Sequence, residues 1–211
     1  MSTSHSLIRR ATAVAAAATA ALALAACGSD GESPAGHDAH ASASPTTSAS
    51  ATTAQGQHNA ADVAFAGGMI PHHRQAVEMA DLAPTRAESA EVKKLADEIK
   101  RAQDPEIKTL SGWLTSWGEQ VPAEGAMNHS MHGAGGGMMM PEEMDTLKAS
   151  SGKAFDTAFM EMMINHHEGA VSMAKTEKAD GAFPDATTMA DAIITSQTAE
   201  ITRMNTLLGK S

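Results

Sequence analysis

The sequence repeats itself once at an offset of 94 residues, and this repeat constrains the fold more than any other feature. Met69-Ile70-Pro71-His72-His73 matches Met163-Ile164-Asn165-His166-His167, and the register continues without a gap into a second pair of segments. Over residues 62–114 and 156–208, 18 of 53 aligned positions are identical. The chain is therefore expected to contain two copies of one structural unit.

Each unit is predicted to contain two helices. Apolar residues in the first segment and the second segment recur at spacings of three and four, which places them on one helix face. The expected helices are 60–82, 88–117, 142–178 and 185–208, with Pro71 and Pro105 kinking two of them. Breaks are expected at Ala83-Pro84-Thr85 and at 181–184, with Asp185 as an N-cap.

Two such helix hairpins predict an all-α fold, a four-helix bundle spanning residues 59–211. The bundle would include a Met- and His-rich crossover loop at 118–141. No alternating pattern typical of strands is present.

The N-terminus has the features of a bacterial lipoprotein signal. Arg9 and Arg10 precede an apolar run of about sixteen residues, too short for a membrane span of about 20 residues. The run ends in Leu24-Ala25-Ala26-Cys27, which resembles a lipobox. We expect residues 1–26 to be the signal peptide, and Cys27 to carry the lipid. Residues 27–58 are then a disordered tether, and the domain lies on the extracytoplasmic face of the cell membrane.

Composition excludes several classes of function. Cys27 is the single cysteine, which excludes a disulfide framework, a Cys-rich zinc site and a Cys-ligated iron–sulfur cluster. A formal charge of −10, four Phe, two Trp and no Tyr argue against nucleic acid as a partner. No nucleophile motif or phosphate-binding loop is present, so we expect a protein that is not an enzyme.

The doubled motif carries a family resemblance. The F-x-x-x-M-I-x-H-H-x-x-A-V-x-M-A segments, each followed by I-x-x-x-Q-x-x-E-I, resemble the domain-of-unknown-function 305 family over about 60–208. The resemblance implies a ferritin-like four-helix bundle in a secreted or lipid-anchored protein. Some members of the family are implicated in copper handling.

The repeated His pairs and nearby methionines form a candidate metal site. Ferritin-like iron sites use Glu-x-x-His, whereas here Met stands three residues before the first His of each pair. Thioether sulfur favours Cu(I) and imidazole binds copper in either state, so copper is the expected ion. The candidate ligands are Met69, His72, His73, Met79, Met163, His166, His167 and Met173.

Polar residues on the second helix of each unit are candidate supports for these ligands. Gln103 and Gln197 lie within apolar stripes, and Glu106 and Glu200 lie at the stripe edges, where each could accept the outer N–H of a ligating His. An ordinary solvent-facing Glu is the alternative interpretation. Asp62 and Asp156 are expected to be structural, either as helix N-caps or as polar partners inside the bundle.

The crossover loop adds possible ligands, because nothing structural requires thioethers in a Gly-rich loop. Met127, His129, Met131 and His132 could form an arm that captures or transfers the ion.

Three functions remain open from the sequence. The first is copper binding for homeostasis or transfer in the cell envelope, with another copper-handling protein as a possible partner. The second is an interaction module in which the His pairs are merely packed and no metal is bound, because Met at helical spacing is often core. The third is a copper or haem redox protein, for which the sequence offers no positive sign.

Overall fold

The computed structural model describes residues 57–125 and 136–210. The predicted signal, Cys27 and nearly all of the predicted tether lie outside these residues. So do the loop candidates Met127, His129, Met131 and His132.

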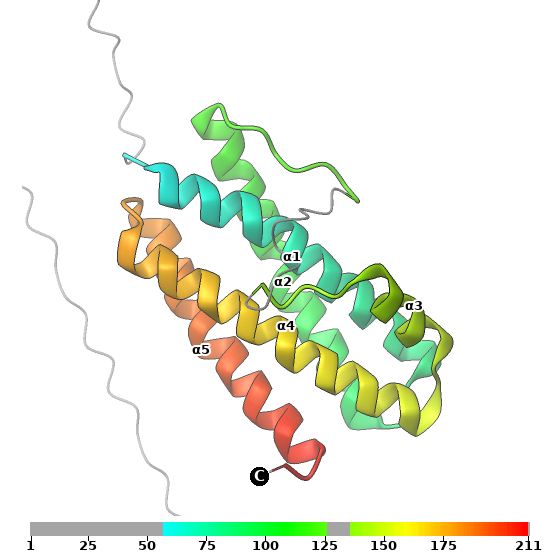
Figure 1. The fold of residues 1–211 in the computed structure, drawn as a ribbon. Helices are drawn as coiled ribbons and strands as arrows, with labels where there is room; N and C mark the ends of the chain where they lie inside the picture. Colours follow the sequence, from blue (N-terminus) through cyan, green and yellow to red (C-terminus); the bar gives the residue numbers. More distant parts are fainter. Residues whose placement is uncertain (1–56, 126–135, 211) are drawn as a thin grey trace, which may run out of the picture. The chain divides into compact units, whose positions relative to one another are not determined.

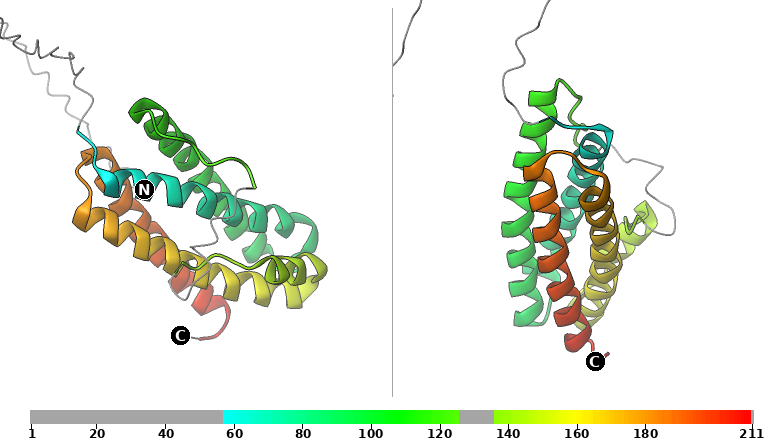
Figure 2. Two further views of the ribbon diagram at one scale, coloured as in Figure 1. Left: turned by 45° about the horizontal axis from the view of Figure 1, so that its top comes forward. Right: turned by 90° about the vertical axis from the view of Figure 1, so that its left-hand side faces the viewer.

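The described residues form an all-α bundle, which confirms the predicted fold class. The helices are α1 (Ala60–Arg86), α2 (Ala90–Trp117), α3 (Pro141–Ala149), α4 (Gly152–Asp180) and α5 (Pro184–Leu207). α1 packs along α2, and α4 packs along α5, as two helix hairpins. The hairpins meet mainly through α1 and α4, which run in opposite directions, and short α3 lies across them (Figures 1 and 2).

The predicted break at Ala83-Pro84-Thr85 is wrong, because α1 continues through Pro84 to Arg86. The chain turns instead at 87–89, where Ser89 caps α2 and accepts backbone hydrogen bonds from Glu91 and Val92. Pro71 and Pro105 do lie inside α1 and α2; the expected kinks stay a prediction. At α5, the N-cap is Phe183 rather than Asp185, which lies in the first helical turn after Pro184.

The predicted helix 142–178 is also wrong, because it is two helices. α3 ends at Ala149, Ser150 and Ser151 are extended, and Gly152, the first residue of α4, adopts the left-handed backbone at φ +62°. Glycine adopts this conformation at no steric cost, so the chain can turn between two helical segments.

Each hairpin is tied to the other by a buried aspartate. Asp156 of α4 accepts hydrogen bonds from the backbone N–H groups of Glu88 (3.1 Å) and Ser89 (2.8 Å) in the turn of the first hairpin. Its repeat partner Asp62 of α1 accepts from Ala182 and Phe183 in the turn of the second hairpin. The aspartates are thus polar partners across the bundle, and Asp62 also completes the capping box of α1 with Asn59.

Apolar side chains form two separate cores at opposite ends of the bundle. The α3-side core contains Met79, Leu95, Phe155, Phe159 and the two α3 residues Met144 and Leu147. The tryptophan-side core contains Phe65, Met69, Leu110 and Ile193, with Trp113, Trp117 and Phe183 packed against it. Because the repeats are antiparallel, equivalent residues of the two units lie in opposite cores.

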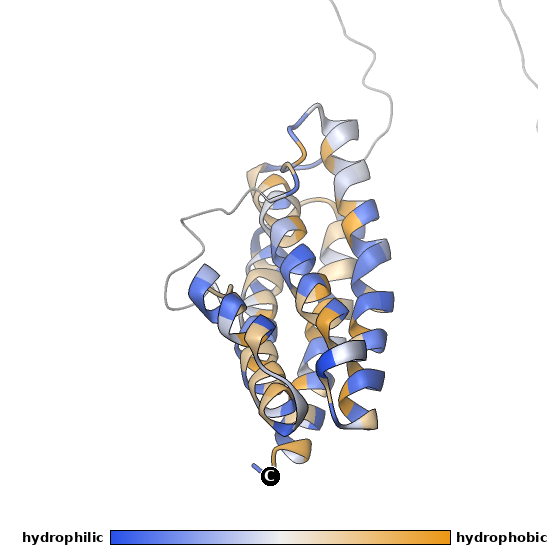
Figure 3. Ribbon diagram, turned by 90° about the vertical axis from the view of Figure 1, so that its right-hand side faces the viewer, coloured by the Kyte–Doolittle hydropathy of each residue, from blue (hydrophilic) through white to orange (hydrophobic). Residues whose placement is uncertain are grey.

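Along their lengths the helices mix hydrophilic and hydrophobic residues (Figure 3). Within residues 57–125 and 136–210, none of the helices is both long and apolar enough to span a membrane.

Candidate metal centre

Four buried histidines form a polar layer between the two cores. His72 and His73 come from the middle of α1, and His166 and His167 come from the middle of α4. All four side chains have 0% exposure. The rings of His72 and His166 lie with centroids 3.8 Å apart, so the antiparallel packing of α1 and α4 brings the two repeats together at this point. We call these four residues the histidine layer.

Three of these imidazoles are held by a hydrogen bond at Nε2. Glu106 Oε2 lies 2.8 Å from Nε2 of His73, and Glu200 Oε2 lies 2.6 Å from Nε2 of His167. The carbonyl oxygen of Gly136 lies 2.9 Å from Nε2 of His72. Carboxylate and carbonyl oxygens accept, so each of these rings donates an N–H from Nε2, and the structure gives its Nδ1 no hydrogen-bond partner.

The remaining ring nitrogens are buried and have no hydrogen-bond partner. This holds for Nδ1 of His72, His73 and His167, and for both nitrogens of His166. Unsatisfied buried polar atoms are rare in proteins and costly, and they gather at sites with a function. An imidazole anchored at one nitrogen and free at the other is the usual state of a metal-ligating histidine, whose outer N–H is bound by a carboxylate or a backbone carbonyl.

Burial keeps the central pair of imidazoles uncharged. Desolvation, with the neighbouring His73, lowers the pKa of His72 to about 3, and the hydrogen bond to Gly136 opposes this only in part. Desolvation and the adjacent His72 hold the pKa of His166 well below its usual range. Neutral imidazole is the form that binds metals, so His72 and His166 can bind an ion without first losing a proton.

The two glutamines also lie in this layer. Gln103 of α2 and Gln197 of α5 are buried, and the side-chain oxygen of each has no hydrogen-bond partner. The histidines were their expected partners, yet the described hydrogen bonds include none between them. Each amide oxygen is a further unsatisfied acceptor in the layer.

The structure separates the candidate methionines into two groups. Met69 and Met163 lie one helical turn before His72 and His166, are fully buried, and border the layer from opposite cores. Met79 lies six residues after His73, about 9 Å along the helix axis, among the apolar residues of the α3-side core. Met173, at the same offset from His167, packs against the tryptophan-side core. The histidine layer therefore does not include Met79 and Met173.

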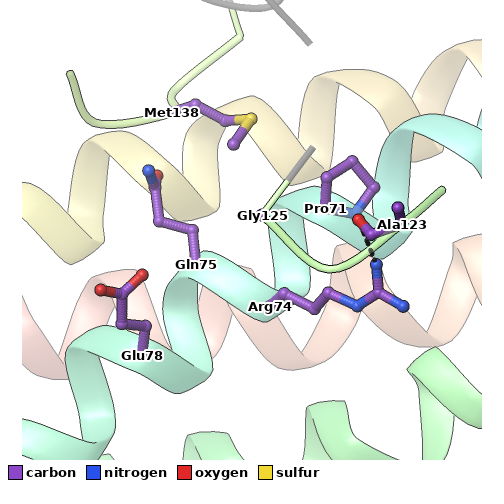
Figure 4. A pocket seen from close by; sticks show the side chains of 7 residues that line it. All are labelled: Pro71, Arg74, Gln75, Glu78, Ala123, Gly125 and Met138. Atoms are coloured by element: carbon purple, nitrogen blue, oxygen red, sulfur yellow. Dashed lines mark hydrogen bonds between the residues drawn. The ribbon is translucent and has the colours of Figure 1, made fainter. Parts of the chain in front are cut away.

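Sequence reasoning missed the segment that closes the layer from outside. Residues 136–140, here called the strap, run over α4. The carbonyl oxygen of Gly136 in the strap accepts the hydrogen bond from His72 Nε2. Gln75 fixes the strap by two hydrogen bonds with the backbone of Met139, at 2.9 and 2.7 Å. Figure 4 shows Met138 of the strap above α1, beside a hollow of about 80 Å³ that Gln75 and Arg74 also line.

Glycines let the strap lie directly on the backbone of α4. A Cβ atom on Gly169 would be 2.3 Å from the carbonyl oxygen of Gly136. Gly137 has φ +67°, and a Cβ there would be 2.4 Å from the carbonyl oxygen of Asn165. The sequence signal for the strap was the glycine run in the loop. By itself a glycine run indicates flexibility, and it does not predict a contact with α4.

We predict that Gly169→Ala displaces the strap, because its Cβ would meet backbone atoms that cannot rotate away. The expected cost is about 1–3 kcal/mol of folding free energy, as for other overpacked sites. Hydrogen exchange at the Met139 amide should become faster, since its bond to Gln75 is lost. Gly67→Ala is the control: a Cβ at this α1 glycine meets nothing within 4 Å, so stability should stay equal or rise. Unchanged protection at Met139 would contradict the prediction.

The donor set limits how a metal could be held. Within the residues that the structure describes, no group of three or more His, Cys, Asp or Glu side chains is arranged to hold an ion. An ion in the layer would therefore need fewer imidazoles together with a thioether, and Met69 and Met163 are the sulfur donors that border it. Mixed imidazole and thioether ligands fit a soft ion better than iron or magnesium.

The doubled motif and the bundle agree with a known family. A family model described as "Domain of unknown function (DUF305)" matches residues 62–208. The chain belongs to the DUF305 family. No sequence among curated proteins matches it.

Several solved structures are similar to this DUF305 chain in both fold and sequence. A DUF305 protein from Streptomyces coelicolor is 31% identical, with a TM-score of 0.64 over 71% of this chain and 93% of that one. A DUF305 fragment from Deinococcus radiodurans is 27% identical, with a TM-score of 0.65 over 72% and 98%. CopM in a Cu(II)-bound form is 38% identical, with a TM-score of 0.60 over 69% and 94%. CopM has also been solved in Cu(I)-bound and Ag-bound forms.

Proposed function

We infer that this DUF305 protein binds copper in its histidine layer and serves copper homeostasis or transfer at the outer face of the cell membrane. The role is that of a binding protein and not of an enzyme, and the ion is the cargo. A second copper-handling protein would deliver or receive it.

One observation carries this proposal. Three buried imidazoles, those of His72, His73 and His167, are each held at Nε2 and have no hydrogen-bond partner at Nδ1. If the histidines were only packed, these unsatisfied polar groups would lower the free energy of unfolding of the protein without serving a function. The Cu(I)- and Cu(II)-bound forms of CopM, at 36% and 38% identity, support copper as the ion.

The residues would have distinct parts in holding the ion. His72 and His166, whose rings are adjacent, supply nitrogen donors, and Met69 or Met163 supplies sulfur. Glu106 and Glu200 orient His73 and His167 through hydrogen bonds at Nε2. The loop residues Met127, His129, Met131 and His132 would capture or pass on the ion.

Anaerobic titration of the full-length protein with Cu(I), in competition with a chromophoric chelator, tests the site. We expect the His72→Ala/His166→Ala double variant to lose the tightest binding event. His58→Ala is the control, because this histidine is exposed and stacks on Trp117 outside the layer. Equal stoichiometry and affinity in the wild type and the double variant would refute the assignment.

The membrane location rests on the lipobox-like segment ending at Cys27. Cys27→Ser removes the sulfur that would carry the lipid, so we expect the protein to leave the membrane fraction and to lose label from radioactive palmitate. Ser29→Ala, two residues later, should change neither. A Cys27→Ser protein that stays with the membrane would overturn the lipid anchor while leaving the copper site untouched.

A further inference from the structure

Among residues 57–125 and 136–210, the outer faces of the two repeats are not equally covered. An open hollow of about 210 Å³ lies between α1 and α4 beside the tryptophan-side core, lined by Ala61, Ala64, Phe65, Gly68, Met173, Thr176 and Glu177. Shifting each of these positions by 94 residues gives Phe155, Ala158, Phe159, Met162, Met79, Leu82 and Ala83. All seven equivalents belong to the α3-side core or pack against it.

On that equivalent face the occupant is visible. α3 covers it, and Met144 and Leu147, three residues apart on one side of α3, are buried at 3% and 0% exposure among those side chains. The hollow is therefore the counterpart, in the other repeat, of a surface shaped to receive a short amphipathic helix. Phe65 and Met173 line the hollow and are identical to their counterparts Phe159 and Met79. Ala61 and Gly68 stand where the α3-covered face has Phe155 and Met162, so smaller side chains leave room in the hollow.

The sequence offers no second copy of α3 to fill the hollow. At the offset of 94 residues, the sequence that aligns with α3 is residues 47–55, TSASATTAQ. Ser50 and Thr53 replace the two apolar residues that anchor α3. A segment without a large apolar side chain gains little from burial in an apolar hollow, so it does not suit this surface.

One difference between the faces indicates the chemistry of the missing partner. Glu177 stands where the α3-covered face has Ala83. Its side chain is 1% exposed, lines the hollow, and lies beside the buried carboxylate of Asp62. Two buried acids side by side, without a base between them, favour a ligand that brings a donor or a positive charge.

We propose that the hollow binds a short amphipathic helix of a partner protein, which inserts an apolar side chain as α3 does and places a basic side chain against Glu177. Leu147 shows where the base would enter. It is the later of the two buried α3 residues and lies in one core with Ala83. One turn beyond it, the carbonyl oxygen of Ser150 accepts from Arg86, three residues after Ala83. This interaction is independent of copper binding.

Two labelled peptides test the proposal with the full-length protein in metal-free buffer. The first is residues 136–151 of this chain, and the second is the same peptide with Leu147→Lys. We expect both to bind by fluorescence anisotropy, the lysine peptide at least fivefold more tightly. Glu177→Gln should remove that advantage, because it keeps the shape of the side chain and removes the acid.

A blocked hollow provides the matched control. Ala64→Trp places an indole in the hollow and should weaken both peptides at least tenfold, whereas Ala102→Trp, at an exposed alanine of α2, should change binding less than twofold. Circular dichroism confirms that both variants are folded.

Several results would overturn the proposal. These are no binding of either peptide to the wild type, equal affinity of the two peptides, or loss of binding with Ala102→Trp as large as with Ala64→Trp. A dimer in sedimentation that Ala64→Trp dissolves would make a second copy the occupant instead. Tighter peptide binding after deletion of residues 42–56 would make the chain's own N-terminal segment the occupant.

Discussion

Replacing His166 with leucine is expected to make the metal-free protein more stable and to abolish its response to copper. Both ring nitrogens of His166 are buried without a partner, and burial holds its pKa well below the usual range. An apolar side chain of similar size leaves no unsatisfied group behind, and each such group costs about 1–3 kcal/mol. We expect a gain of about 1–2 kcal/mol in the free energy of unfolding, measured by chemical denaturation without metal.

The copper response should change in the opposite sense. An ion that binds only the native state stabilises it by about 2.7 kcal/mol at a hundredfold excess over the dissociation constant. The wild type should show this gain, and His166→Leu should not.

Ile193→Leu, a volume-conserving change in the tryptophan-side core, is the control and should keep the full response. A His166→Leu protein that is less stable without metal would show that the imidazole is satisfied and packed, as an interaction module would require.

The second large effect is expected at Asp156. Its carboxylate accepts two backbone hydrogen bonds, from Glu88 and Ser89, and is 7% exposed. Hydrogen bonds to charged groups contribute about 1.5–3 kcal/mol each, and Asp156→Ala leaves both donors without a partner. We expect a loss of about 2–4 kcal/mol by chemical denaturation, because the turn of the first hairpin is no longer tied to α4.

Asp97→Ala measures the effect of removing an exposed carboxylate. Asp97 pairs with Arg101 four residues later on the surface of α2, and its side chain is 55% exposed, so the loss should stay below about 0.5 kcal/mol. If Asp156→Ala and Asp97→Ala lowered the free energy of unfolding equally, the hydrogen bonds from Asp156 to the first hairpin would contribute nothing to stability.

Asp62→Ala is expected to lower the free energy of unfolding by less than the hydrogen bonds of Asp62 suggest. Burial and the adjacent Asp62 raise the pKa of Glu177 to about 8, so removing the Asp62 carboxylate also relieves Glu177. Asp156 has no such neighbour, since Ala83 stands at the equivalent position.

Local patterns were enough to predict the helices but not all of their ends. Apolar spacing predicted four long helices, and the structure contains them, with α3 separated from α4. Pro84 indicated a break that does not occur, because the turn is placed three residues later, where Asp156 binds the backbone. That acceptor is 67 residues away from Ser89 in the chain, so no local signal could reveal it.

The sequence by itself determined the duplication, the all-α class and the family, and it made Glu106 and Glu200 candidate partners of the His pairs. These follow from residue type and spacing, which act within one repeat. The tertiary structure alone decided that both motifs meet in one buried layer, that Met79 and Met173 lie outside it, and that the strap closes it. It also decided that α3 covers one repeat, while among the described residues the equivalent face of the other repeat has a hollow. Such features depend on the antiparallel contact of α1 with α4, which places His72 against His166. The spacing of residues along the chain does not reveal that contact.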